Sequence, residues 1–420
     1  MDVREFPVLS DDDGRLVDRL AVGLGEDLGR VLAYLLLRAE RERDADAHAS
    51  RLAVRVGTEL SRNAVTDALS RLQERDFVNT TTVRDETRGR PPRAWYVSCD
   101  RETAVERVYG GHADALLDRA RAVFDVADEP GGDAGADADG GREVTVGLNW
   151  APNGLHLPLF AAAGRGEYAD RGVSVDFERN DGSSAAVEAV SSGAADVGVA
   201  GATSVLRARQ QGRKVVPIAV PFQRAMAVLY AERDRFGTSF KSVQQLRGRR
   251  IGMPVESEVG LLARLFLSQS GVLSDVELVD VAGEERDALR SGRVDVVTGS
   301  FSDPRELREE GVRVDSLLVA DRFPIYGSCL IAPEEALRRR REPLADFLAA
   351  TTAGWAEAVR RPYEVHAVGG ADSASERRTF ELAADEFGSS DAVRRRGWGW
   401  QDPETWRRLE TALAVADIDG

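Results

Sequence analysis

Apolar residues near the start of the chain recur with the period of an α-helix. One face of this first helix carries Leu28, Val31, Leu32, Leu35 and Leu36. A second, shorter helix is predicted over residues 47–56. A third is predicted to start after Ser61, a residue type that favours N-caps, and to end at Glu74. The pattern therefore predicts a small helical unit at the start of the chain.

The third predicted helix divides into an apolar and a polar face. Val65, Leu69 and Leu72 share the apolar face. The residues left facing outward are Arg62, Asn63, Thr66, Asp67, Ser70 and Arg71. Beyond this helix, the β-like runs 77–83 and 94–98 flank the turn RDETRGRPPR, so a hairpin rich in arginine is expected.

A longer helical stretch follows, and the chain then changes character. Residues 102–124 favour a helix that could pair two subunits, although Gly110 and Gly111 are positions where it could break. Residues 127–142, ADEPGGDAGADADGGR, contain nothing that could form a core, so we predict a flexible acidic linker. The expected domains are therefore residues 1–126, with the long helix at their end, and residues 143–420.

The second domain alternates short apolar strands with helices. The strands are predicted at residues 173–177, 196–200, 215–220, 250–253, 276–280 and 294–298. Helices are predicted between them at residues 184–192, 203–211, 258–270 and 284–291. This alternation is typical of an α/β domain with largely parallel sheets.

The second domain also contains one internal repeat. SSGAADVGVAG at residues 191–201 and RSGRVDVVTGS at residues 290–300 share the frame Ser-Gly-x-x-Asp-Val. In each, glycine is expected to end a helix before a buried strand begins. The repeat favours two lobes of similar build with a cleft between them, although coincidence is the alternative because such joints are common.

Charge narrows the classes of function. The chain has 71 acidic and 56 basic residues, a net charge of −15, and Lys214 and Lys241 are its only lysines. This acidic, lysine-poor composition resembles that of proteins from halophilic archaea. It argues against a protein that coats nucleic acids or membranes, but it leaves room for one local DNA-binding face.

Cysteine usage and hydropathy point to a cytoplasmic protein. Cys99 and Cys329 form neither a metal-binding pattern nor a disulfide framework. The opening MDVREFPVLSDDDG lacks the apolar core of a signal peptide, and no stretch approaches the roughly 18 apolar residues of a membrane helix. We therefore expect no membrane insertion, no metal and no cofactor.

The order of three helices and an arginine-rich hairpin resembles the winged helix-turn-helix module. LSRNAVTDALSRLQERDFV is similar to that family's recognition helix, and GRPPRAWYV is similar to its wing. The resemblance covers roughly residues 25–100. It implies that the module binds double-stranded operator DNA, with the polar helix face in the major groove, and that the protein is a homodimer.

The DNA-contacting residues would lie on the third helix and on the hairpin, where arginines can reach phosphates or a minor groove. The candidates are Arg62, Asn63, Thr66, Ser70, Arg71, Arg88, Arg90 and Arg93. The alternative is a solvated helix face beside a surface loop with no such function.

A dense set of polar and aromatic residues, NWAPNGLH, follows the strand-like run 144–148. The longer stretch VGLNWAPNGLHLPLFAAAGRGEYADRGVSVDF resembles the family that joins fungal thiamine-pyrimidine synthases to bacterial periplasmic pyrimidine-binding proteins. The matching positions are Asn149, Trp150, Pro152, His156, Gly166, Tyr168, Gly172 and Val173. The resemblance continues through ADVGVAG, LRGRRIGMPVES and SGRVDVV, covers about residues 144–355, and extends more distantly to sulfonate-, nitrate- and taurine-binding proteins.

The resemblance implies an α/β two-lobed, hinged, periplasmic-binding-protein-like domain preceded by the winged helix-turn-helix domain. Lobe one would comprise about residues 144–225 and 325–400, and lobe two about residues 228–322. A ligand would bind in the cleft at strand ends and helix N-termini, with Trp150 stacking on a planar ring. The candidate ligand-binding residues are Asn149, Trp150, Asn153, His156, Ser183, Ser184, Thr203, Ser204, Glu256 and Tyr326.

Several of these candidates have a structural alternative to a role in ligand binding. In that alternative, Trp150 would be a packed core aromatic, and His156 would be a buried structural histidine. Ser183 and Thr203 would be helix caps, and Glu256, like Glu258, would be a solvated charge at a helix start.

The chain departs from the synthases of this family at the positions that carry chemistry. The family's pyridoxal-phosphate lysine would fall near Ala200, and its sacrificial histidine near Ser204. Only Cys329, in FPIYGSCLIAP, remains of the Cys-rich run that would hold iron. These three departures lead us to expect a binder, not an enzyme. The loop PVESEV lacks the family's phosphate-binding Gly and Lys and carries two carboxylates, so we expect an unphosphorylated, neutral or cationic heterocycle such as a thiamine-pyrimidine precursor.

Two functions follow. The first is a one-component, ligand-responsive transcriptional regulator, because a DNA-binding and a ligand-binding module would share one chain. The alternative is a binding protein of an ABC transport system for a thiamine precursor, sulfonate or nitrate-like ligand.

Overall fold

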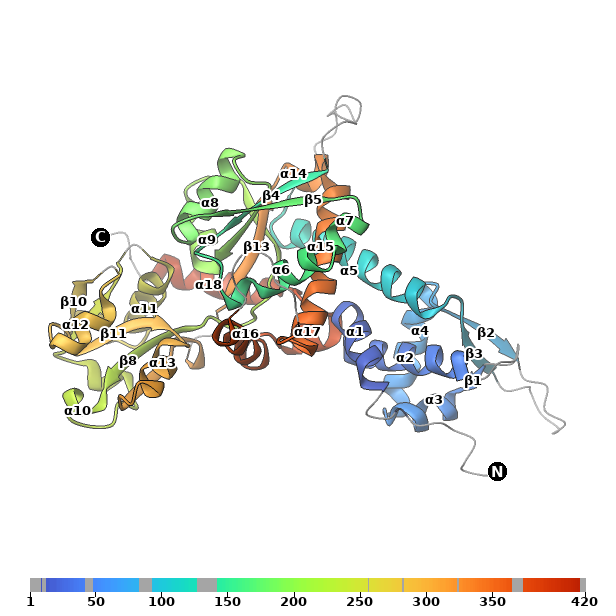
Figure 1. Ribbon diagram of the computed structural model, residues 1–420, viewed down its shortest axis with the longest axis horizontal. Coiled ribbons are helices and arrows are strands. Elements are labelled where there is room, and N and C mark those ends of the chain that lie inside the picture. Colours follow the sequence, from blue (N-terminus) through green and yellow to red (C-terminus); the bar gives the residue numbers. More distant parts are fainter. Residues whose placement is uncertain are drawn as a thin grey trace.

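The computed structural model describes residues 9, 13–41, 48–82, 93–126, 142–255, 257–281, 283–322, 325–364 and 373–415. Three sequence predictions fall outside these residues: the linker other than Arg142, the hairpin turn with Arg88 and Arg90, and Glu256. Figure 1 shows an elongated molecule in which an N-terminal unit, defined as residues 9–126, is followed by two α/β lobes.

The N-terminal unit combines helices with a small antiparallel sheet. Its helices are α1 (Gly14–Leu24), α2 (Glu26–Arg41), α3 (Arg51–Thr58), α4 (Arg62–Glu74) and α5 (Arg101–Val123). Its strands are β1 (Ala49–Ser50), β2 (Val78–Thr82) and β3 (Arg93–Val97), in the spatial order β1-β3-β2. The hairpin β2–β3 follows α4, as the sequence predicts.

The predicted helices of this unit form with shifted ends. The Ser61 hydroxyl accepts a hydrogen bond from the Ala64 N–H at 3.1 Å, so the predicted N-cap of α4 is confirmed. The second helix begins at Arg51, later than predicted, because Ala49 and Ser50 pair with β3. Helix α1 was not predicted, although Leu16, Leu20 and Leu24 repeat every four residues and are buried.

Helix α5 runs unbroken through Gly110 and Gly111, so the predicted break is wrong. Its N-cap is Asp100, whose carboxylate accepts the Thr103 N–H at 2.8 Å, and this bond lowers the pKa of Asp100. The helix packs against α15 (Arg341–Arg360) and α1 of the same chain. This packing buries nine of its residues and stabilises the helix despite the two glycines.

Each lobe contains a five-stranded sheet. Lobe one has the order β5-β4-β6-β13-β7, with strands β4 (Glu143–Leu148), β5 (Ser174–Arg179), β6 (Val197–Gly201), β7 (Val215–Ala219) and β13 (Ser328–Pro333). Lobe two has the order β10-β9-β11-β8-β12, with strands β8 (Ala227–Glu232), β9 (Arg250–Met253), β10 (Glu277–Asp280), β11 (Val296–Ser300) and β12 (Val314–Leu318). The predicted division into lobes is confirmed.

Helices cover both sheets. Those of lobe one are α6 (Leu157–Gly164), α7 (Glu167–Asp170), α8 (Ser183–Ser192), α9 (Ala202–Gln210), α14 (Ala336–Arg339), α15, α16 (Ala374–Phe387) and α17 (Asp391–Arg396). Those of lobe two are α10 (Arg233–Phe236), α11 (Glu258–Gln269), α12 (Glu285–Ser291) and α13 (Asp303–Glu309). Helix α18 (Pro403–Val415) contacts α9 and α11, and short 3₁₀ turns occupy Gly154–His156, Val243–Leu246, Leu273–Asp275 and Val319–Asp321.

The prediction of largely parallel sheets holds for four of the five strands in each sheet, which run in the same direction, whereas β13 and β8 run in the reverse direction. In lobe one, β4 pairs in parallel with β5 and β6, whereas β13 pairs antiparallel with β6 and β7. In lobe two, β9 pairs in parallel with β10 and β11, whereas β8 pairs antiparallel with β11 and β12. Strands β8 and β13 are the first strands after the chain crosses between the lobes, and each enters its new sheet in the reverse direction.

The internal repeat marks equivalent joints in the two lobes. Gly193 and Gly292 end α8 and α12 in the left-handed conformation, at φ 80° and φ 75°. The Asp196 carboxylate then accepts the Thr145 N–H at 2.9 Å, and the Asp295 carboxylate accepts the Arg250 N–H at 2.9 Å. Each aspartate therefore ties its strand to the neighbouring parallel strand, which gives the shared frame a physical meaning.

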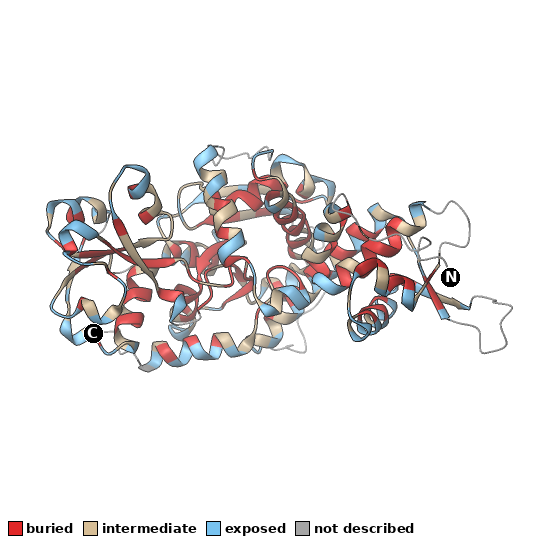
Figure 2. Ribbon diagram, turned by 90° about the horizontal axis from the view of Figure 1, so that it is seen from below, coloured by how far each residue is buried: buried red, intermediate tan, exposed pale blue. Residues whose placement is uncertain are grey.

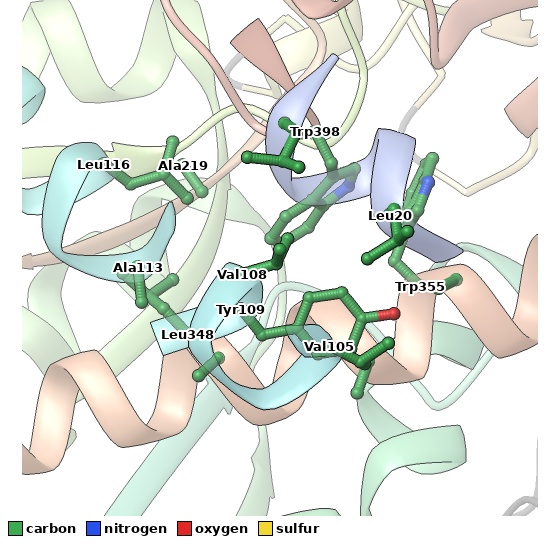
Figure 3. Close-up of a cluster of buried hydrophobic side chains, with 14 of the residues drawn as sticks. Leu20, Val105, Val108, Tyr109, Ala113, Leu116, Ala219, Leu348, Trp355 and Trp398 are labelled. Carbon is green, nitrogen blue, oxygen red and sulfur yellow. The ribbon is translucent and has the colours of Figure 1, made fainter. Parts of the chain in front are cut away.

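One hydrophobic core joins the N-terminal unit to lobe one. Figure 3 shows residues of α1 and α5 packed against residues of β7, α15 and Trp398, and all of them belong to the same buried cluster. In Figure 2 the buried residues accordingly continue along the interior of the long axis of the molecule. The N-terminal unit is thus docked on lobe one by apolar packing.

Residues 397–401, here called the bridging segment, lie at this junction. On one side, Trp398 N–H donates to the Val22 carbonyl at 2.7 Å, and the Trp398 carbonyl accepts from His112 Nε2 at 2.7 Å. On the other side, the carbonyls of Gly399 and Trp400 accept from Val220 N–H at 2.9 Å and from Gln223 Nε2 at 3.0 Å. The segment therefore links the N-terminal unit to the end of β7, where the chain leaves lobe one.

Replacing Gly397 should weaken this junction. Gly397 has φ 103° and ψ 172°, and a Cβ there would lie 2.6 Å from the Val22 carbonyl oxygen and 2.8 Å from His112 Cε1. Gly182 has φ 101° and ψ 167° but open space around its Cβ position. Both alanine variants should lose about 1–3 kcal/mol through backbone strain, and Gly397→Ala should lose about 1–3 kcal/mol more through overlap.

Urea unfolding followed by tryptophan fluorescence would measure both losses. Gly182→Ala is the matched control because it shares the backbone conformation without the contacts. Equal losses in the two variants would show that the close approach at Gly397 does not constrain the junction.

Candidate functional site

A cleft of about 1360 Å³ lies between the two lobes. Its walls include residues that follow β4, β9 and β11 and residues that precede α8, α11 and α13. Ligands of α/β proteins bind at such strand-to-helix connections, where backbone groups and short side chains face a crevice. The cleft is therefore the candidate ligand-binding site.

Trp150 lines this cleft directly after β4 and is 56 % exposed. The Arg179 guanidinium, at the end of the neighbouring strand β5, lies 5.9 Å from the centre of its ring and forms an ion pair with Asp181 at 3.1 Å. The alternative of a packed core aromatic does not describe this residue. An exposed indole face on a cleft wall suits stacking with a planar ring.

Asn149 and His156 form a pair in the same wall. His156 Nε2 lies 3.0 Å from Asn149 Oδ1, and His156 is 2 % exposed. Burial lowers the pKa of His156 to about 4, so the imidazole is neutral near pH 7. Because Asn149 Oδ1 is an acceptor, Nε2 carries the proton, which fixes the Asn149 side chain with its amide NH₂ free of this bond.

Asn153 uses its side chain locally. Its Oδ1 accepts the Leu155 N–H at 2.9 Å, and its Nδ2 donates to the Ala151 carbonyl at 3.0 Å. These bonds cap the short turn Gly154–His156 and shape the loop that carries Trp150. Asn153 lines the cleft, but both of its polar atoms already have partners.

The remaining predicted residues divide between the cleft and the interior. Ser183 and Ser184 line the cleft, and the buried Ser183 hydroxyl accepts the Gly201 N–H at 3.0 Å. Thr203, Ser204 and Tyr326 are described but are not among the lining residues. The Tyr326 hydroxyl accepts the Asp402 N–H at 2.7 Å, so it stabilises the segment before α18.

Glu258 lines the cleft from lobe two and contacts the start of α9 in lobe one. Its carboxylate accepts the Thr203 N–H at 3.1 Å and the Ser204 N–H at 2.8 Å, and it also accepts the Ser204 hydroxyl. Burial raises the pKa of Glu258, while these hydrogen bonds act in the opposite direction. The alternative of a solvated charge at the start of α11 does not describe Glu258.

Sequence reasoning missed the lobe-two wall. There the Arg286 guanidinium lies 3.3 Å from Asp303 Oδ1 and also pairs with Glu306. Burial alone would lower the pKa of Arg286. The hydrogen bonds and charges of Glu306 and Asp303 outweigh burial, so the pKa is raised. The repeat could have found this wall, because its 99-residue offset maps the candidate Ser204 onto Asp303.

Three residues that line the cleft have a buried polar atom with no hydrogen-bond partner among the described residues. These atoms are His156 Nδ1, Thr298 Oγ1 and Trp398 Nε1. Buried polar groups are rarely left unpaired in native proteins. The cleft-lining residues therefore include three buried polar atoms whose hydrogen-bonding capacity is unmet among the described residues.

The described ranges contain neither a candidate metal centre nor a candidate membrane span. No group of three or more His, Cys, Asp or Glu side chains in these residues could hold a metal ion. None of the helices formed by the same residues combines the length and hydropathy needed to cross a membrane.

The fold and the cleft define a two-lobed protein of the periplasmic-binding-protein type. Residues 153–365 match the family model described as NMT1/THI5 like, and the chain belongs to that family. A Candida albicans gene product with the generic periplasmic binding protein fold superimposes with a TM-score of 0.52 at 14% identity, covering 66% of this chain and 90% of that one. This likeness supports the fold alone.

Two curated relatives are named as binding proteins. The riboflavin-binding protein RibY of Chloroflexus aurantiacus is 29% identical over 294 residues, which cover 66% of this chain and 82% of the relative. The formylaminopyrimidine-binding protein of Halalkalibacterium halodurans is 27% identical over 228 residues, which cover 53% of this chain and 68% of the relative.

Buried His156 should make stability depend on pH. Its folded pKa of about 4 lies below the unfolded value of 6.5, so the unfolded chain binds the proton first as the pH falls. Stability should therefore be lost between about pH 6.5 and pH 4, by about 2 kcal/mol per histidine between pH 7 and pH 5. His112, whose pKa burial also lowers to about 4, should contribute similarly.

Chemical unfolding at pH 7 and pH 5 would test this dependence in the wild type, His156→Gln, His112→Gln and the double variant. Each single substitution should reduce the loss between the two pH values by about half of the histidine contribution. An unchanged loss in the double variant would contradict the assignment of neutral, buried imidazoles.

Proposed function

We propose that this chain is a small-molecule-binding protein that holds a planar, uncharged or cationic heterocycle in the interlobe cleft. The observation that carries the proposal is the exposed Trp150 ring at the cleft wall, beside an Asn149 amide that His156 holds in place. Stacking would bind the ring face, and the amide would read its edge. Membership of the NMT1/THI5-like family supports the same class of function.

The charge of the cleft supports an uncharged or cationic ligand. Carboxylates outnumber arginines on the lobe-two wall, which includes Asp280, Glu284, Glu285, Asp287, Asp303 and Glu306. Its arginines are already paired, Arg286 with Asp303 and Glu306, and Arg290 with Glu310. An anionic ligand would therefore meet repulsion without a free cation to offset it.

The relatives suggest the ring system. The two named binding proteins take riboflavin and a formylaminopyrimidine, both planar nitrogen heterocycles. A cleft of about 1360 Å³ has room for fused rings as well as for a single pyrimidine. The proposal assigns binding and no reaction, because Ala200 and Ser204 stand where the family's synthases would carry their lysine and histidine.

Ligand capture fits a binding protein that delivers its ligand to a membrane permease, and the two relatives named as binding proteins support the capture step. A second candidate is a ligand-responsive transcriptional regulator, which the architecture of the N-terminal unit favours. Helices α2, α3 and α4 precede the hairpin β2–β3, and β1 completes the sheet β1-β3-β2, an order that matches a winged helix-turn-helix module.

The predicted DNA face is compatible with this second candidate. Arg62, Asn63, Thr66 and Ser70 are exposed on α4, and Arg93 is exposed at the start of β3. Arg71 is half-buried and pairs with Asp67 at 3.4 Å, so it is less free to contact a base. Short polar groups, together with Arg62, whose side chain has no partner among the described residues, suit contacts from a helix surface in a major groove.

The bridging segment supplies a route by which the cleft could influence this unit. Trp398 is one of the residues that line the cleft, and its backbone bonds to Val22 of α1 and His112 of α5. A ligand would change the N-terminal unit only if it bound one arrangement of these contacts more tightly than another.

Trp150→Ala should weaken ligand binding without unfolding the protein. Loss of the stacking face should reduce affinity about tenfold or more, and Trp150→Phe should retain part of it. Isothermal titration calorimetry with riboflavin and with an aminopyrimidine would measure the affinity, and thermal shift would measure the melting temperature.

Tyr363→Ala is the matched control, because Tyr363 is an aromatic residue of similar exposure, 53 %, that does not line the cleft. It should bind ligand like the wild type. A large fall in melting temperature for Trp150→Ala alone would assign Trp150 to the core, and wild-type affinity for that variant would remove the stacking role.

Arg62→Ala should abolish or strongly weaken operator binding if the second candidate is correct. Removing a groove-contacting arginine should cost about 1–3 kcal/mol, or roughly tenfold or more in affinity. Fluorescence anisotropy with DNA from upstream of the protein's own gene would measure this loss, and calorimetry should show unchanged ligand affinity.

Arg313→Ala, an equal change of charge on the surface of lobe two, provides the control. Failure of the wild-type protein to bind this DNA, or equal binding by the Arg62 and Arg313 variants, would exclude the regulator role for this helix. Loss of both DNA and ligand binding in Arg62→Ala would show that α4 supports the fold.

A further inference from the structure

We propose that Glu258 is a specificity-determining residue that occupies the anion-binding position at the N-terminus of α9 and thereby excludes ligands that carry a phosphate or sulfonate there. This inference rests on the proposed ligand-binding function of the cleft and narrows its ligand class. It also identifies an anion site that the protein fills with its own carboxylate.

The first-turn amides of α9 are fully used. The Ala202 N–H donates to the Gly327 carbonyl at 3.2 Å, and the N–H groups of Thr203 and Ser204 donate to the Glu258 carboxylate. The N-cap Gly201 has no side chain to satisfy these donors. Without Glu258, the second and third amides and the Ser204 hydroxyl would form a set of converging donors.

The space at this helix end is shaped for the carboxylate. A Cβ at Gly201 would lie 2.2 Å from Glu258 Cδ and 2.4 Å from Glu258 Oε1. The glycine therefore permits a close approach that any larger residue would block. This steric match is independent of the hydrogen bonds and indicates that the carboxylate position is built into both lobes.

The chemistry of the contact is that of an anion site. The N-terminus of a helix attracts negative charge because its free N–H groups and its dipole point outward. Glu258 provides two carboxylate oxygens there, much as a phosphate or sulfonate would. The position borders the cleft, because Glu258, Ser183 and Cys329 all line it.

The contact also crosses between the lobes. Glu258 is the first residue of α11 in lobe two, and Ser257 caps that helix by accepting the Gly260 N–H at 3.1 Å. Helix α9 belongs to lobe one. An anionic ligand would therefore have to displace a carboxylate that already joins the two lobes, whereas an uncharged ligand would leave this contact in place.

Removing the carboxylate should create an anion site. In Glu258→Ala, inorganic phosphate and sulfate should bind with a Kd of about 10 mM or lower and should raise the melting temperature above that in sodium chloride of equal ionic strength. The wild type should show no phosphate-specific rise. Glu258→Gln, which keeps the space filled, should also show none.

Asp287→Ala removes another cleft carboxylate, one that is exposed and belongs to α12, and it tests whether a general loss of charge is sufficient. It should not respond to phosphate. A folded Glu258→Ala protein that ignores both anions, or a wild type that binds phosphate equally well, would overturn the proposal. So would a response of Asp287→Ala equal to that of Glu258→Ala.

The test also covers a variant that folds poorly. Purification of Glu258→Ala or Glu258→Ser in phosphate or sulfate should restore folding, because an external anion would replace the lost carboxylate; an unfolded variant that neither anion rescues would overturn the proposal. The probes are inorganic phosphate and sulfate, so this outcome does not depend on heterocycle binding. Failure of riboflavin and aminopyrimidine to bind the wild type would instead contradict the proposed function.

Discussion

The backbone of the bridging segment, residues 397–401, is the constraint on which the arrangement of the N-terminal unit and lobe one depends. Buried backbone N–H and C=O groups must be paired, and those of Trp398 are paired with Val22 and His112. The next two carbonyls are paired with groups at the exit from β7. A shift of the N-terminal unit would therefore break hydrogen bonds on a segment that also contributes to the cleft.

The polar side chains that line the cleft are of two kinds. Some already form hydrogen bonds within the protein, and others have groups that remain available to a ligand. Asn153, Ser183 and Glu258 line the cleft, but their oxygens already accept backbone N–H groups. Asn149 differs, because His156 engages only its carbonyl and leaves its NH₂ available. Recognition would then rely on few groups, chiefly an aromatic face and one oriented amide.

Much of the fold could be predicted from the sequence, because periodicity reports burial along a single element. The strand 250–253 and the Ser61 cap were found in this way. The antiparallel strands β8 and β13 were not, because an apolar run does not encode its direction or its partner. In the site, Trp150 was found through its motif, whereas the wall around Arg286 and Asp303 arises from tertiary pairing that spacing alone cannot reveal.

Contacts between the two lobes could favour uncharged or cationic ligands over anions even where the ligand itself makes few contacts. The chain leaves lobe one beside the bridging segment, and the Phe222 carbonyl accepts the Gly327 N–H at 2.9 Å where the chain returns. Glu258 adds a contact between α11 and α9 elsewhere in the cleft. A neutral ring in the cleft would gain stacking and keep this contact, whereas an anion would first have to break it. The proposed discrimination would therefore come from the Glu258 hydrogen bonds that the protein would lose.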